Sequence, residues 1–167
     1  MALIVEDATG LATAESYISV DFFKSYHKDR GNDISLGGTE IEQKLRIATE
    51  YIDLRFKPIG LAIASDQALC HPTDYFITDP VSLPVQLQRA CAEYAFFSIS
   101  NTLFIDQSFS DGPGIKLLKE KVGPIETETE WSGHGLGSLT KQYPSVPKAD
   151  KLMHQISIGS GQGGVYR

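Results

Sequence analysis

The sequence predicts a mainly α-helical fold: a small helical bundle that carries an inserted β-hairpin and has extended segments at both ends. Three observations lead to this prediction. Apolar residues recur at helical spacing in three stretches, at about 19–30, 39–56 and 83–104. One stretch, 115–131, surrounds a Gly-Pro pair that suits a hairpin turn. A chain of 167 residues is also long enough for one domain with a modest core.

The first helix is expected at about 19–30, after an extended, turn-rich N-terminal arm. Ser19 is a favourable N-cap, and Asp21 lies in the first turn, where a negative charge complements the helix dipole. Gly31 suits the end of this helix. Its apolar side consists of Phe22, Phe23 and Tyr26.

The second helix is expected at about 39–56. Thr39 and Glu42 have the spacing of a capping box, and Pro58 stops the pattern. One face of this helix is apolar through Ile41, Leu45, Ala48 and Ile52. The proline-containing stretch 59–82 follows and is predicted to be a long surface loop.

The third helix is expected at about 83–104, because Ser82 and Pro84 are residues that favour the start of a helix. It is apolar nearly all the way round, and the neighbours Phe96 and Phe97 point about 100° apart. Such a helix is either the central core element or is covered on a second side by a neighbouring subunit.

A two-residue turn at 123–124 would place Lys121 opposite Glu126 and Lys119 opposite Glu128. An isolated two-stranded ribbon is marginal in water, so this hairpin should pack against something. We therefore predict a subunit interface formed by Lys119, Lys121, Val122, Ile125, Glu126 and Glu128.

A final helix is expected at about 148–156, which closes a domain spanning 1–156. The glycine-rich remainder, 157–167, is predicted to be a flexible tail. Tyr and Arg dominate interface hot spots, so the tail is interpreted as a flexible linker whose last residues bind a partner protein. An ordinary disordered terminus is a competing interpretation. The predicted docking residues are Ile156, Ile158, Val165, Tyr166 and Arg167.

Motifs for chemistry are sparse, and we predict no catalytic residue, no metal site and no cofactor. The histidines, at 27, 71, 134 and 154, lack the spacing of zinc ligands, and no CxxC pair is present. The adjacent pair Cys70-His71 is interpreted as structural, with Cys70 and Cys91 as free thiols. Glu6, Asp7, Asp74 and Asp79 are interpreted as solvated loop charges. No stretch has the length and apolarity of a membrane span.

The charge balance disfavours a general duplex-DNA binder. The formal net charge is -6, whereas such proteins usually present a basic face to the phosphates. The best basic–aromatic cluster is on the first helix, where Lys24, Lys28 and Arg30 fall near Phe23, Tyr26 and His27. We favour a solvated helix end whose aromatic residues fill the core.

Three segments, in this order, resemble a known family: Val5–Ser19, Glu120–Glu126 and Tyr143–Val146. They are similar to the head–tail adaptor (connector, or head completion) proteins of tailed bacteriophages. Many sequences of that family carry the label of a DnaT-like single-stranded-DNA-binding protein.

The resemblance implies a structural protein of the virion neck, made in the host cytoplasm and not an enzyme. It implies a ring, usually a dodecamer, that assembles beneath the portal after DNA packaging from subunits that can be monomeric when free. The implied partners are the portal ring, which the C-terminal extension contacts, and the next neck or tail protein. DNA would pass through the lumen without specific binding, and an acidic lumen wall would let it slide. The alternative is a DnaT-like single-stranded-DNA-binding replication accessory protein.

Overall fold

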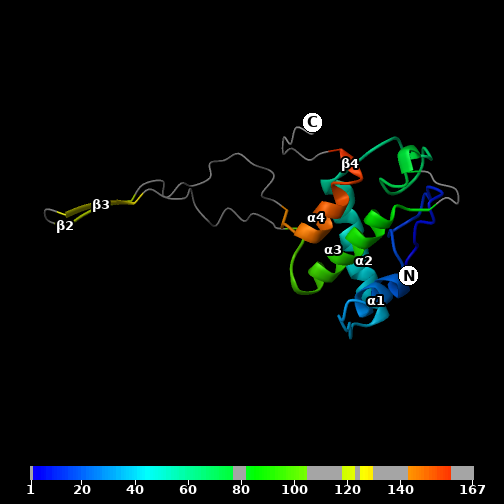
Figure 1. Cartoon of the computed structure of the whole chain (residues 1–167), viewed down its shortest axis with the longest axis horizontal. Coiled ribbons are helices and arrows are strands. Elements are labelled where there is room, and N and C mark those ends of the chain that lie inside the picture. The colour runs from blue at the N-terminus through cyan, green and yellow to red at the C-terminus, as the bar shows by residue number, and fades with distance from the viewer. Residues whose placement is uncertain (1, 77–81, 105–117, 123–124, 130–142, 159–167) are drawn as a thin grey trace. The chain divides into compact units, whose positions relative to one another are not determined.

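The computed structural model describes residues 2–76, 82–104, 118–122, 125–129 and 143–158 (Figure 1). The chain divides into two units, one comprising 1–103 with 145–167 and the other comprising 104–144. Among the described residues, the first unit contains a bundle of four α-helices, and the second contains an antiparallel hairpin. The predicted fold class, mainly α with a small inserted hairpin, is therefore confirmed.

Helix α1 (Val20–Lys28) forms as its capping signals predict. The Ser19 hydroxyl accepts a hydrogen bond from the backbone N–H of Phe22 at 3.1 Å, which satisfies one of the free amides of the first turn. After the helix, Gly31 adopts a positive φ of 77°, a conformation that favours glycine. The helix is two residues shorter at its C-terminal end than the predicted 19–30.

Helix α2 (Gly38–Arg55) matches the predicted 39–56 closely, but the predicted capping box is wrong. The N-cap is Gly37, and the Glu40 carboxylate accepts a hydrogen bond from its backbone N–H at 3.0 Å. Thr39 is already inside the helix, so it cannot cap it. The predicted apolar face is confirmed, since all four of its members are buried: Ile41, Leu45, Ala48 and Ile52.

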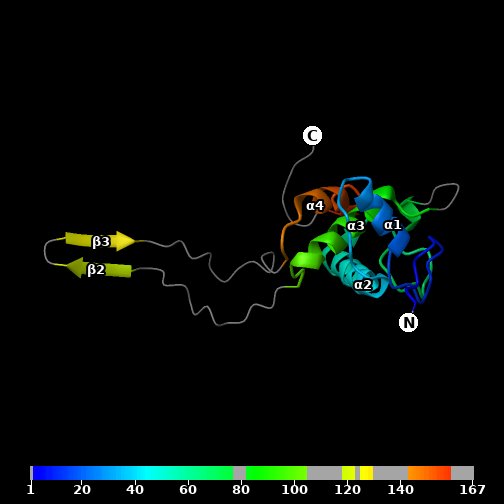
Figure 2. The ribbon, with the colours of Figure 1, turned by 90° about the horizontal axis from the view of Figure 1, so that it is seen from below.

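Helix α3 (Val85–Ser100) is the central element and packs against α1, α2 and α4 (Figure 2). It is shorter than the predicted 83–104 because Pro84 is the N-cap and Asn101 turns to extended backbone. Side chains on most of its circumference are buried, including Leu87, Ala90, Cys91, Ala92, Tyr94 and Ala95.

Within the described residues, no helix is both long and apolar enough to cross a membrane.

The predicted final helix, 148–156, is wrong at its end. Helix α4 (Pro147–Met153) stops three residues earlier, where the Ser157 hydroxyl donates a hydrogen bond to the Met153 carbonyl at 2.7 Å. Ser157–Ile158 then form strand β4, which pairs antiparallel with β1 (Lys57–Pro58). The chain beyond the helix is thus held to the bundle through residue 158, so the predicted tail does not begin at 157.

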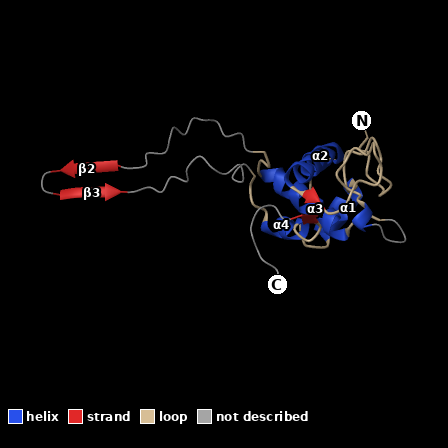
Figure 3. Cartoon of the chain, turned by 90° about the horizontal axis from the view of Figure 1, so that it is seen from above, coloured by secondary structure: helices blue, strands red, loops and turns tan. Residues whose placement is uncertain are grey.

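The N-terminal segment folds onto the helical unit instead of extending as an arm. Val5 and Ser16 form a parallel bridge, and the buried Glu6 carboxylate accepts hydrogen bonds from the N–H groups of Gly10 and Leu11 at 2.8 and 2.9 Å. The interpretation of Glu6 as a solvated charge was therefore wrong. The loop 59–76 lies beside this segment (Figure 2), since the Ala68 N–H donates to the Leu11 carbonyl. That loop contains a short 3-10 helix, η1 (Asp74–Phe76). Figure 3 shows loop backbone gathered next to the N-terminus.

Strands β2 (Leu118–Val122) and β3 (Ile125–Thr129) form the hairpin. Their register places Lys121 opposite Glu126 and Lys119 opposite Glu128, as predicted. The turn at 123–124 and the outer parts of the predicted 115–131 lie outside the described residues.

Candidate functional site

The predicted interface residues have different positions in the two units. In the hairpin, Val122 pairs with Ile125 next to the turn, and the two Lys–Glu pairs follow along the ribbon. In the helical unit, Ile156 is only 1 % exposed and belongs to the core, whereas Ile158 is 54 % exposed on β4. The remaining predicted docking residues, Val165, Tyr166 and Arg167, lie outside the described residues.

A groove between α1 and α3 is lined by two of the six members of the predicted basic–aromatic cluster, Tyr26 and Arg30. We call it the α1–α3 groove; its volume is about 380 Å³ and its lining includes Phe22, Tyr26, Asp29, Arg30, Val85 and Arg89. Phe23 and His27, two of the three predicted aromatic members, are fully buried. His27 Nε2 donates to the Ala92 carbonyl at 3.1 Å, and burial lowers the pKa of this imidazole. These two rings are core residues and cannot stack with a base.

The one ring of the cluster that reaches the groove is already covered by a cation. The Arg30 guanidinium carbon lies 3.5 Å from the centroid of the Tyr26 ring, and Arg30 Nη1 donates to the Tyr26 carbonyl at 2.7 Å. The Tyr26 hydroxyl donates to Glu93 at 2.7 Å, and Glu93 also pairs with Lys148. Burial and the Glu93 hydrogen bond raise the pKa of Tyr26. A nucleotide base would have to displace Arg30 to stack on this ring.

A second group of polar side chains lies under the loop 59–76, and sequence spacing did not reveal it. The Asp53 carboxylate accepts hydrogen bonds from the Tyr17 hydroxyl and, at 3.2 Å, from the Cys70 N–H. The Tyr17 oxygen in turn accepts from the His71 N–H at 3.2 Å. Burial raises the pKa of Asp53 to about 6, and no cation of the described residues pairs with this carboxylate. We call these four residues the Asp53 cluster.

The Asp53 cluster is poorly suited to nucleophilic chemistry. Burial, together with the Asp53 charge, raises the pKa of the Cys70 thiol to about 11. Burial lowers the pKa of the His71 imidazole to about 4. Near neutral pH both groups are uncharged, so the reactive thiolate is scarce. Neither group is therefore in the charge state that a thiolate–imidazole pair requires.

A third buried group joins α4 to the bundle just after the segment 104–144. Arg55 makes a two-pronged ion pair with Asp150, with N–O distances of 2.9 and 3.1 Å. Asp150 also accepts hydrogen bonds from the Tyr94 hydroxyl, the Ser145 hydroxyl and the Val146 N–H. Burial and the Asp150 hydrogen bond raise the pKa of Tyr94. Ser145 and Val146 come from the Tyr-Pro-Ser-Val motif, so this motif anchors the chain where it returns to the bundle.

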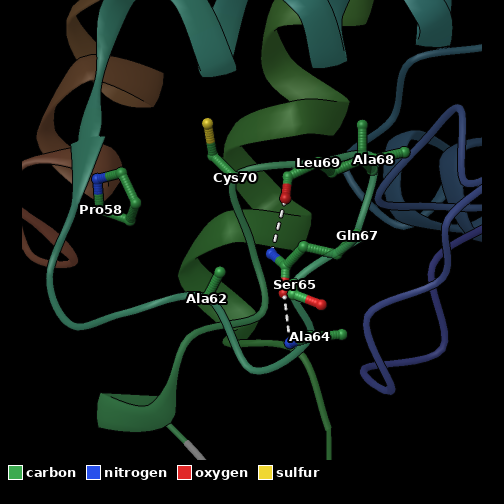
Figure 4. A pocket seen from close by; sticks show the side chains of 8 residues that line it. All are labelled: Pro58, Ala62, Ala64, Ser65, Gln67, Ala68, Leu69 and Cys70. Atoms are coloured by element: carbon green, nitrogen blue, oxygen red, sulfur yellow. Dashed lines mark hydrogen bonds between the residues drawn. The ribbon is translucent and has the colours of Figure 1, made fainter.

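The loop 59–76 also lines an open pocket of about 540 Å³ (Figure 4). Its walls are largely small and apolar: Pro58, Ala62, Ala64, Ala68, Leu69 and Cys70. Ser65 and Gln67 complete the lining. Among the described residues, no three His, Cys, Asp or Glu side chains are grouped in a way that could hold a metal ion.

Comparison with known proteins gives one match. A family model described as "Putative DnaT-like ssDNA binding protein" matches residues 1–167. No curated protein and no solved structure matches the chain.

Proposed function

The chain belongs to this family of DnaT-like single-stranded-DNA-binding proteins, and we propose that it acts as a structural adaptor of the phage neck. In this role, copies of the chain assemble into a ring beneath the portal, extend the DNA channel and connect the head to the tail. The portal ring, other copies of the chain and the next neck or tail protein are its partners, and its place is the virion.

The hairpin is the observation that carries this proposal. Strands β2 and β3 have five residues each, and in the described part of the chain each pairs only with the other. A two-stranded ribbon of this size is marginal in water and gains stability by pairing with or packing on another surface. In a ring, the neighbouring copy offers such a surface to every hairpin. An assembling role thus accounts for a hairpin inserted between two helices of a bundle.

The chain's acidic charge and the resemblance of its segments give further support. The formal net charge is -6, and a duplex slides more freely past a neutral or acidic wall than past a basic one. The resemblance of 5–19, 120–126 and 143–146 to the phage adaptors points in the same direction. In those proteins the C-terminal extension contacts the portal, and we assign this contact to the segment that starts at Ile158.

Single-stranded-DNA binding is the second candidate, and the description of the family favours it. Single-strand binders combine a positive groove with exposed aromatic rings on which bases stack. Arg89 supplies an exposed cation to the α1–α3 groove, whose lining includes Phe22, and Lys24 and Lys28 are exposed elsewhere on α1. However, Asp29 also lines this groove, and Arg30 covers Tyr26. The geometry of this groove therefore gives little support to base stacking on Tyr26.

One experiment separates the two candidates. The purified chain is sedimented with isolated portal rings, and a parallel tube contains labelled single-stranded oligonucleotide. The adaptor proposal expects stoichiometric pelleting with the portal and no retention of DNA. DNA retention that weakens with rising salt, without portal association, would establish the second candidate and overturn the first.

Two variants test the contacts assigned to the adaptor. Lys119→Glu combined with Lys121→Glu places like charges opposite Glu128 and Glu126, so ring assembly on the portal should fail. A matched double change, Lys24→Glu with Lys28→Glu on the exposed side of α1, should leave assembly intact. Removal of 159–167 retains β4 and should abolish portal attachment; unchanged attachment would refute the assignment of the tail.

A further inference from the structure

The pocket in the loop 59–76 has no part in either proposed function, and its walls are suited to an apolar side chain. Pro58, Ala62 and Leu69 provide apolar surface, and Ser65 adds one hydroxyl (Figure 4). Ligand sites in proteins have this character, with mostly apolar walls and a few polar groups that orient the ligand. The volume, about 540 Å³, is within the range of such sites.

The wall of the pocket is held in place by the side chain of Gln67. Its Oε1 accepts hydrogen bonds from the N–H groups of Ile63 and Ala64 at 3.0 and 3.2 Å. Its Nε2 donates to the carbonyls of Leu69 and Pro72 at 2.7 and 3.2 Å. One amide thus links both sides of the loop, so the pocket is already formed before anything binds. A preformed site loses less conformational entropy on binding.

Apolar surface continues outside the pocket. Leu61 and Tyr75 are 75 % and 65 % exposed, and they come from the two sides of the Ala62–Thr73 bridge. The Leu61 N–H donates to Asp74 at 2.7 Å, and the Asp74 N–H returns a bond to the Leu61 carbonyl at 2.9 Å. These bonds hold the backbone of Leu61 next to Ala62, which lines the pocket.

The C-terminal residues of the same chain start next to this pocket. Ile158 on β4 pairs with Lys57 on β1, and Lys57 precedes Pro58 in the pocket wall. An extended chain advances about 3.3 Å per residue, so Val165 can reach about 20 Å from Ile158. The intervening residues, 159–164, are Gly, Ser and Gln, which can follow a curved surface.

We propose that Val165 and Tyr166 of the chain's own C-terminus bind in this pocket. They are the only large apolar residues after Ile158. Tyrosine combines an apolar ring with a hydroxyl, which matches apolar walls that carry the Ser65 hydroxyl. The adaptor proposal assigns the same residues to the portal, so this binding describes the chain before it meets the portal. Its test uses the chain alone, and its outcome does not depend on whether the portal is bound.

Cys70 reports on occupation of the pocket without any engineered label. It lines the pocket and is half-buried, whereas the other cysteine, Cys91, is fully buried; both are free thiols. The rate of alkylation by a maleimide is measured at one pH for the full chain and for a chain ending at Ile158. A C-terminus bound nine-tenths of the time should slow the alkylation of Cys70 about tenfold in the full chain.

Two single changes test whether Tyr166 is the residue that binds in the pocket. Tyr166→Ser should raise the alkylation rate to that of the truncated chain, and Gln162→Ser, a change in the spacer, should leave protection intact. The melting temperature of each variant verifies that the fold is kept. Amide NMR shifts give an independent reading, since loss of the C-terminus should move the signals of Ala62 to Cys70.

Equal alkylation rates in the full and truncated chains, with unmoved amide signals, would overturn the proposal. Protection that increases with protein concentration would also overturn it, because the anchor would then come from another copy. Protection that is the same at all concentrations is the expected result for binding within one chain.

Discussion

The Asp53 cluster leads to an unusual prediction about pH. The contributions of two buried groups to the free energy of unfolding change in opposite directions as pH changes, so they nearly cancel. Burial raises the pKa of Asp53 from 3.8 to about 6, and burial lowers the pKa of His71 from 6.5 to about 4. Each group is uncharged in the folded state over a pH range where it is charged in the unfolded chain. Tyr17 and Cys70 are the other titratable groups of the cluster, and both have their pKa raised, so they stay uncharged in this range.

The sign of each contribution follows from proton linkage. The raised pKa of Asp53 means that its contribution to the free energy of unfolding falls as pH rises from about 4 to about 6. The lowered pKa of His71 means that its contribution falls as pH drops from about 6.5 to about 4. Each shift exceeds two pKa units, which is about 3 kcal/mol at 1.36 kcal/mol per unit. The two contributions together should vary by less than about 1 kcal/mol between pH 4 and 7.

Asp53→Asn removes one of these contributions and leaves the other in place. The free energy of unfolding is measured by urea denaturation of the full chain and of the variant at several pH values. Any cost of the lost hydrogen-bond acceptor is independent of pH, so only the change in the difference between the two proteins matters. Relative to the unmodified chain, Asp53→Asn should gain about 3 kcal/mol of stability as pH rises from below 4 to above 6.

His71→Gln is the mirror-image variant and provides the control. Relative to the unmodified chain, it should gain about 3 kcal/mol as pH falls from above 6.5 to below 4. A difference between Asp53→Asn and the unmodified chain that does not change with pH would show that Asp53 titrates alike in both states. The reasoning about its burial would then be refuted.

Three further predictions concern single contacts, and each is checked by chemical or thermal unfolding. Asp150→Ala removes the carboxylate partner of the half-buried Arg55, so it should lower the free energy of unfolding by about 3–5 kcal/mol. Lys148→Ala removes a more exposed ion pair with Glu93 and should lower it by less than about 1 kcal/mol. Similar losses for the two variants would contradict this account. Gly60→Ala should cost about 1–3 kcal/mol, because Gly60 has a φ of 92° and an added Cβ would lie 2.9 Å from Tyr75 Cβ. Its control is Gly38→Ala, where no atom lies within 4 Å of the added Cβ and no loss is expected. Glu6→Gln keeps only one of the two acceptor oxygens used by the N–H groups of Gly10 and Leu11, so it should lower the free energy of unfolding by about 1–3 kcal/mol. An unchanged midpoint of the unfolding transition would show that water replaces the lost acceptor.

Local patterns in the sequence were sufficient to predict most elements of the fold. The stripe from Ile41 to Ile52 and the Ser19 cap depend on residues within one or two turns of each other, so spacing alone indicates the helices. The hairpin register follows from the length of its turn for the same reason. The ends of α3 and α4 were predicted less well, because caps and the pairing of β4 with β1 decide where a helix stops.

Only the tertiary structure brought together groups that are far apart in the chain. Asp53 meets Tyr17 and Cys70, and Arg55 meets Asp150, across separations of 17 to 95 residues. No periodicity relates such positions, since the packing of helices and loops creates these contacts. The pocket and the buried Glu6 involve residues close together in the chain, but they depend on loop conformations that no periodicity indicates. The sequence by itself determined the helices and the hairpin, because local interactions specify them. Folding decided which charges are buried and which surfaces are available to a partner.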